Sequence, residues 1–77
     1  LNVNLYLVPA KEQLFVEVSV NSSYAIQVFT LSGRKLMEQN ECLGKTILNT
    51  EALQPGMYML RIRNDQGTVV RRFVIGN

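Results

Sequence analysis

The arginines are the residues whose type and spacing in this sequence suggest a chemical role. Arg61 and Arg63 lie two residues apart, and Arg71 and Arg72 follow after a short break that contains Gly67. A planar guanidinium group binds a carboxylate or a phosphate through two parallel hydrogen bonds. If the two segments pair as a hairpin, we expect Arg61, Arg63 and Arg71 to share one surface that docks an anionic partner. The other interpretation, a solvated sheet face whose charges discourage edge-to-edge aggregation, stays open.

The residue types that most enzymes and metal sites require are missing or isolated. The sequence contains no His, so the commonest general base and metal ligand is absent. Its one cysteine, Cys42, has no activating partner and is expected to be a small apolar residue near a strand end. The acids have neither the spacing of paired catalytic carboxylates nor that of a calcium loop: Glu12, Glu17, Glu38, Glu41, Glu51 and Asp65. We therefore expect no enzymatic activity, no cofactor and no bound metal.

Length and composition indicate one small globular domain. With 77 residues, 47% of them hydrophobic and 18% charged, the chain can form one core and is too apolar for a disordered tail. The net charge of +2 lacks the dense basic stripe of a nucleic-acid binder. No apolar run approaches the roughly 20 residues of a membrane helix, so direct membrane insertion is not expected. Because the chain opens at Leu1 without an initiator Met or a signal peptide, we expect residues 1–77 to be a single domain cut from a longer protein.

Hydrophobic and polar residues alternate along most of the chain, which is the periodicity of β-strands. Turn residues separate the alternating segments into seven predicted strands: residues 1–8, 14–20, 24–31, 35–39, 45–49, 57–64 and 68–75. Their apolar positions form the expected core: Leu14, Val16, Val18, Ile26, Val28, Leu60, Ile62 and Phe73. Val20 continues the apolar face of the second strand. We also expect Leu36 and Ile47 to anchor the fourth and fifth strands and Ile75 to be buried. Phe29 and Leu31 have the opposite parity, so the third strand is either covered on both faces or shifted by a bulge.

Seven short strands joined by tight turns favour an all-β fold, an immunoglobulin-like antiparallel β-sandwich. Residues 53–58 are similar to the tyrosine corner of such sandwiches, in which a Tyr near the start of a strand hydrogen-bonds back to the preceding loop. We expect Tyr58 to make this bond and Gly56 to let the chain turn into the strand with a positive φ. The alternative for Tyr58 is an ordinary core aromatic.

Four segments of the sequence, in order, resemble one protein family. Residues 6–18 are similar to the opening of the C-terminal sorting domain of type IX (Por) secretion cargo, and residues 24–34 look like its central strand and Ser-Gly-basic turn. Pro55-Gly56-Met57-Tyr58 resembles its most characteristic motif, Pro-Gly-x-Tyr, and residues 67–75 resemble its terminal strand. The chain departs from the family at Tyr6-Leu7-Val8-Pro9, where Tyr-Pro-Asn-Pro is usual.

The resemblance implies that the chain is a secretion signal and not an enzyme. Such domains direct cargo to the surface of Gram-negative cells. After Sec-dependent passage to the periplasm the outer-membrane machinery reads the folded domain, and in many members a surface sortase then removes it. The implied partners are the type IX machinery and the sortase, and the implied location is the periplasm in transit, then the cell surface or the medium. The residues that we expect to take part lie at the corner and along the last two strands: Gly56, Tyr58, Arg61, Arg63, Gly67, Arg71, Arg72 and Phe73.

Two other functions stay open. A sandwich that packs against a secreted hydrolase would show an extended apolar outer face, to which Met57, Met59 and Phe15 would contribute. An immunoglobulin-like adhesion or glycan-binding accessory module would display aromatic rings that stack on sugars. The candidates for such rings are Tyr6, Phe15, Tyr24 and Phe29.

Overall fold

The computed structural model describes residues 2–19 and 21–76, which form seven β-strands and one short 3-10 turn. The strands of the first half are β1 (Val3–Val8), β2 (Gln13–Val18) and β3 (Tyr24–Thr30), with the turn η1 (Pro9–Lys11) between β1 and β2. The strands of the second half are β4 (Lys35–Cys42), β5 (Lys45–Asn49), β6 (Gly56–Asn64) and β7 (Gly67–Ile75).

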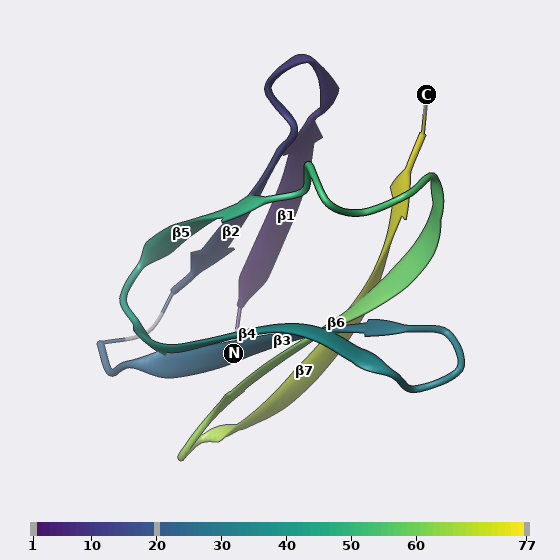
Figure 1. Ribbon diagram of the computed structural model, residues 1–77. Coiled ribbons are helices and arrows are strands. Elements are labelled where there is room, and N and C mark those ends of the chain that lie inside the picture. The colour runs from purple at the N-terminus through teal and green to yellow at the C-terminus, as the bar shows by residue number, and fades with distance from the viewer. Residues whose placement is uncertain (1, 20, 77) are drawn as a thin grey trace.

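The strands form two antiparallel sheets, which lie on either side of the core (Figure 1). One sheet has the order β1-β2-β5, and the other has the order β4-β3-β6-β7. This is the arrangement of an immunoglobulin sandwich, in which strands A, B and E of one sheet face strands C′, C, F and G of the other. The predicted fold class is therefore confirmed.

The core lies where the sequence pattern predicts it. All the described residues of the predicted core are buried, and Val20 lies outside the described residues. Ile75 and Leu36 are only partly buried, but both pack against the core. Cys42 is buried, in agreement with its interpretation as a small apolar residue. Four further buried side chains complete the hydrophobic cluster: Tyr24, Cys42, Leu48 and Tyr58.

The prediction that Ile47 anchors β5 is wrong. Ile47 is 48% exposed, whereas its neighbours Thr46 and Leu48 are buried. The register explains the difference, because Leu48 pairs with Leu14 and Thr46 with Val16, the two inward residues of β2. Residues that lie directly opposite each other in a sheet share a face, so β5 must turn Ile47 outward. The hydroxyl group of Thr46 is buried without penalty because it hydrogen-bonds with the Tyr24 hydroxyl group at 2.8 Å.

β4 is longer than predicted, and it is irregular. The strand continues beyond residue 39 to Cys42, where a loop was expected. Its register against β3 shifts twice, while the pairing of β3 with β6 is continuous, so the extra residues belong to β4. Glu41 has a φ of 58°, the left-handed conformation that some bulges use. The bulges keep the chain in the sheet where sequence patterning indicates a loop.

The outward parity of Phe29 has a simple structural reason. The side chains of β3 alternate regularly between the two faces of the sheet up to Thr30, which places Phe29 on the outer face. The centre of its ring lies 5.2 Å from the guanidinium carbon of Arg61. Leu31 lies beyond the end of β3 in the turn, where it is exposed. Neither predicted explanation applies to β3 itself, because its outward residues are only partly buried and the register shifts belong to its neighbour β4.

The predicted tyrosine corner is confirmed. The Tyr58 hydroxyl group donates a hydrogen bond to the backbone carbonyl oxygen of Gln54, and the Tyr58 ring is buried. Gly56, which begins β6, has a φ of +152°, a backbone conformation that residues other than Gly rarely adopt. The corner therefore fixes both the direction in which the chain enters β6 and the position of the Tyr58 ring in the core.

Candidate functional site

β6 and β7 form the longest regular hairpin of the described chain. Every residue of β6 pairs with one of β7, from Gly56 opposite Ile75 to Asn64 opposite Gly67. The loop between the strands is tight, and the side-chain oxygen of Asn64 accepts a 2.8 Å hydrogen bond from the backbone N–H of Gln66. This register decides which arginines share a face.

The guanidinium groups that share the outer face are those of Arg61, Arg63 and Arg72, which corrects the expectation for Arg71. Arg72 pairs with Met59, and Met59 has the same parity in β6 as Arg61 and Arg63. Arg71 pairs instead with Leu60, a fully buried residue, so it stands on the inner face. Arg71 is nevertheless exposed, because β7 is an edge strand. The two consecutive arginines therefore point to opposite sides of the sheet.

Arg61 is held in place by side chains of β3. Its Nε atom donates a 2.8 Å hydrogen bond to Oε1 of Gln27, its Nη2 atom donates to the same oxygen, and its guanidinium group lies over the ring of Phe29. Lys35 and Glu38 form the one ion pair among the described residues. Arg63 and Arg72 are exposed and have no carboxylate partner within the part of the chain that the structure describes. Lys35 and Gln27 have the larger effects in lowering the pKa of the Glu38 carboxyl group, and Arg63 is close enough to help, but it forms no ion pair with Glu38.

Apolar side chains surround these arginines on the outer face. Val74 is 56% exposed, and Met57 and Val70 are exposed to a similar degree. A shallow hollow lies at the end of β3, lined by Phe29, Leu31, Met59, Arg61 and Val70 together with the residues of the turn. The outer face of this sheet is therefore mixed, with positive charge and apolar surface side by side, as in many protein-binding surfaces.

The far edge of β7 is unpaired. Among the described strands only β6 pairs with it, and none of the backbone hydrogen bonds of the described turns and loops reaches it. Alternate residues of an edge strand direct their N–H and C=O groups away from the sheet, and these groups pair readily with another strand. β7 shows no register shift and contains no Pro, unlike β4 with its two shifts at the opposite edge.

The remaining predicted site residues have structural roles. Tyr58 and Phe73 are buried, pair across the hairpin and stack with a ring-centroid distance of 5.6 Å. Gly56 and Gly67 lie at the two ends of the hairpin. Of the predicted set, Arg63, Arg71 and Arg72 are exposed and Arg61 is half-buried, and the structure divides these four arginines between two faces.

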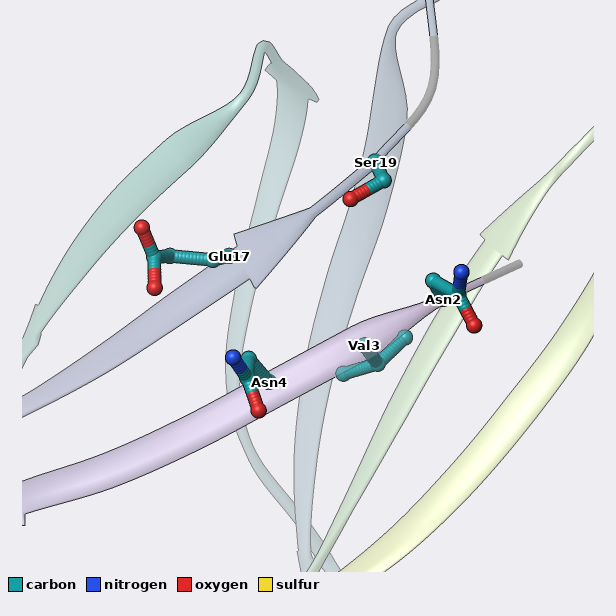
Figure 2. Close-up of a pocket in the computed structure, with 5 residues that line it drawn as sticks. All are labelled: Asn2, Val3, Asn4, Glu17 and Ser19. Atoms are coloured by element: carbon teal, nitrogen blue, oxygen red, sulfur yellow. The ribbon is translucent and has the colours of Figure 1, made fainter.

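A second hollow lies on the other sheet, where β1 begins and β2 ends (Figure 2). Glu17 and Asn4, which pair across these two strands, line it together with Asn2, Val3 and Ser19. It contains one carboxylate group, that of Glu17, and one hydroxyl group, that of Ser19, together with two side-chain amides. No group of three His, Cys, Asp or Glu residues capable of holding a metal occurs among the described residues. None of the helical segments in that part of the chain could cross a membrane.

The outer face of the three-stranded sheet carries an aromatic ladder that sequence patterning does not predict. The rings of Tyr6 and Phe15 stack in parallel at 4.9 Å, and the ammonium group of Lys45 lies 5.7 Å from the centre of the Phe15 ring. The ring faces of Phe15 are therefore occupied on both sides. Phe29 is covered by Arg61, and Tyr24 is buried. Tyr6, which is 45% exposed on the edge strand β1, is the one candidate ring that stays exposed. A glycan-binding site would normally display several exposed aromatic rings, so this geometry does not favour one.

Taken together, the fold and its surface define a small immunoglobulin-like domain whose exposed features suit recognition by another protein. The sequence model of one family, the secretion system C-terminal sorting domain, matches residues 4–76, and the chain belongs to this family. No curated protein matches the chain significantly. The family is that of type IX secretion, so the domain is a sorting signal that interacts with the type IX machinery. It directs export to the cell surface or secretion across the outer membrane of Gram-negative bacteria.

Proposed function

We propose that this chain is a non-catalytic signal that the type IX machinery reads in its folded form, through the β6–β7 hairpin. The observation that carries the proposal is the regular, unpaired edge of β7 with arginines on both of its faces. An extended segment of a partner protein can add to such an edge as a further strand, with backbone hydrogen bonds providing affinity and side chains providing specificity. The edge exists only when β7 is paired with β6, so the signal depends on the fold.

We further propose that the domain is a substrate of a surface sortase and passes through the periplasm as a single domain of a longer protein. Family membership supports this route. The fold is compatible with it, because Cys42 is the one cysteine of the sequence and is buried. Folding therefore needs no disulfide bond and does not depend on the redox state of the compartment.

The test is a fusion of the 77 residues to the C-terminus of a periplasmic reporter protein. In a host with the type IX machinery, the reporter should reach the cell surface or the medium, and in the same host without the machinery it should stay in the periplasm. A reporter that stays in the periplasm of both hosts contradicts the proposed function. Cleavage by the sortase should shorten the surface reporter by about the 8.7 kDa of this chain, and a sortase-deficient host should abolish that shortening.

The requirement for the folded form has its own control. Leu60 is fully buried, so Leu60→Ala should lower the population of the folded domain without touching the hairpin surface. If the folded form is the signal, export of the Leu60→Ala fusion should fall in proportion to its unfolded fraction at the growth temperature. Normal export of a fusion whose domain is mostly unfolded would show that a linear motif is read instead.

A further inference from the structure

We infer that the partner segment that pairs with β7 is an acidic strand. Arg71 and Arg72 would bind its acidic side chains, one on each face of the sheet. This inference rests on the proposed function, because it specifies the chemistry of the partner at the same edge. Edge pairing and charge recognition are then two parts of one interaction.

The position of the two arginines supports this inference. Arg71 is the central residue of the nine that form β7, and Arg72 follows it directly. Their cross-strand partners, Leu60 and Met59, lie on the inner and outer faces of the sheet, so the two guanidinium groups flank the edge on both sides. A strand that adds to β7 also directs consecutive side chains to opposite faces. Two consecutive acidic residues at its centre would therefore each lie beside one arginine.

The charges around the edge have one sign. β7 contains two arginines and no acidic residue, and β6 adds Arg61 and Arg63. Asp65, in the loop at one end, is the sole acid between residues 56 and 76. Arg71 donates a 3.2 Å hydrogen bond to the backbone carbonyl oxygen of its neighbour Val70, so its guanidinium group lies against the strand backbone. An incoming acidic strand would meet complementary charge at the centre of β7.

The same arginines argue against a second copy of the chain as the occupant. In an antiparallel pairing centred on β7, the Arg71 side chains of the two copies lie directly opposite each other. Like charges directly opposite each other destabilise a sheet. The arginine pair therefore has the features of a device that blocks self-association at an otherwise unprotected edge, while it admits a strand of opposite charge.

The binding test uses the isotope-labelled 77-residue chain and three capped nine-residue peptides. These are Thr-Val-Thr-Val-Glu-Glu-Val-Thr-Val and the two versions in which Gln-Gln or Lys-Lys replaces Glu-Glu. We expect the Glu-Glu peptide to shift the backbone amide signals of β7 and to bind about two- to thirty-fold more tightly than the Gln-Gln peptide, with a difference that shrinks as salt is added. Equal binding of the Glu-Glu and Lys-Lys peptides, or shifts confined to β4 or β5, would overturn the inference.

Two matched double variants locate the effect. Arg71→Gln with Arg72→Gln should lose the preference for the Glu-Glu peptide, whereas Arg61→Gln with Arg63→Gln, on the neighbouring strand, should retain most of it. Light scattering on the same samples measures the oligomeric state, and so tests whether a second copy of the chain pairs with the edge of β7. The unmodified chain should be monomeric, and the Arg71/Arg72 variant should associate more strongly. An unmodified chain that dimerises through β7 would contradict the inference.

The reporter fusion separates this inference from the proposed function. If the unmodified fusion is exported and reversing the charge of Arg71 and Arg72 to Glu reduces export at least several-fold, both stand. If the charge-reversed fusion is exported as efficiently as the unmodified one, the inference of an acidic partner strand is wrong and the proposed sorting function is unaffected. If the unmodified fusion is not exported, the proposed function fails, whatever the peptides show. Amide hydrogen exchange on the purified variant checks that it remains folded.

Discussion

The hydroxyl group of Tyr58 donates a 2.5 Å hydrogen bond to the backbone carbonyl oxygen of Gln54, four residues earlier in the chain. The bond connects the loop after β5 to the start of β6, so it holds the corner between the two sheets. Tyr58→Phe keeps the buried ring and its stacking on Phe73 but removes the donor. We expect a loss of about 0.5–1.5 kcal/mol in the free energy of unfolding, measured by urea denaturation. An unchanged stability would show that water replaces the hydroxyl group without cost.

Gly56 tests the backbone part of the same corner. A methyl group added at Gly56 would meet no atom within 4 Å, so any cost of Gly56→Ala comes from the positive φ of +152°. We expect this variant to be destabilised by about 1–3 kcal/mol. Gly76→Ala is the matched control, because it also has free space for a methyl group and no positive φ. Equal stability of the two variants in thermal and urea unfolding would contradict this explanation.

Leu60 measures how much the core contributes to stability. Its side chain is fully buried at the centre of the four-stranded sheet, between β3 and β7. Leu60→Ala should lower the free energy of unfolding by about 2–5 kcal/mol, a large share of the stability of so small a domain. Val74→Ala, at an exposed position of the edge strand, should cost less than about 1 kcal/mol. A loss below about 1 kcal/mol for Leu60→Ala would place the core elsewhere.

The buried phenol of Tyr24 should make the stability of the domain depend on pH in the alkaline range. Burial raises the pKa of its phenol above the usual value, and the nearby Cys42 adds to this, while the hydrogen bond with Thr46 opposes it. Because the phenol keeps its proton more firmly in the folded state, its contribution is fully present below pH 10 and is lost as the pH rises through the folded-state pKa. Tyr24→Phe should therefore be less stable near pH 7 by about 1–2 kcal/mol, because the hydroxyl partner of Thr46 is lost.

The measurement for Tyr24 compares the urea unfolding of the two proteins between pH 7 and pH 11. The two proteins differ only in the Tyr24 hydroxyl group, so the difference between the two curves isolates Tyr24. The gap in stability should narrow above about pH 10. A gap that stays constant or widens would contradict the raised pKa.

Much of the fold follows from the alternation of hydrophobic and polar residues, because a strand with one buried face needs a hydrophobic side chain at every second position. The inward residues of β2, β3 and β6 show this most clearly. The pattern predicts the wrong buried face for β5 because Ile47 is its most obvious hydrophobic residue, whereas the buried Thr46 is stabilised by a hydrogen bond with Tyr24, which is far away in the sequence. A hydrogen bond between residues so far apart in sequence has no local signature.

The error at Arg71 has a different origin. A tight hairpin whose strands meet at Asn64 and Gly67 requires Arg72 to pair with Met59, so the sequence contains the signal for the correct face. The register of this turn, extended along both strands, places Arg71 on the opposite face of the sheet from Arg61, Arg63 and Arg72. The two bulges of β4 and the stacking of Tyr6 on Phe15 depend on contacts between strands that no local pattern encodes.

The stacking of Phe73 on Tyr58 makes the last strand part of both the core and the surface. Removing residues 73–77 would take Phe73 from the core and shorten the edge in one step. A chain that translation has not completed, or that a protease has clipped before β7, therefore lacks a stable sandwich and an intact edge at the same time. Loss of the last strand would therefore remove the folded domain and the proposed recognition edge together, so no folded form of the domain would lack the edge.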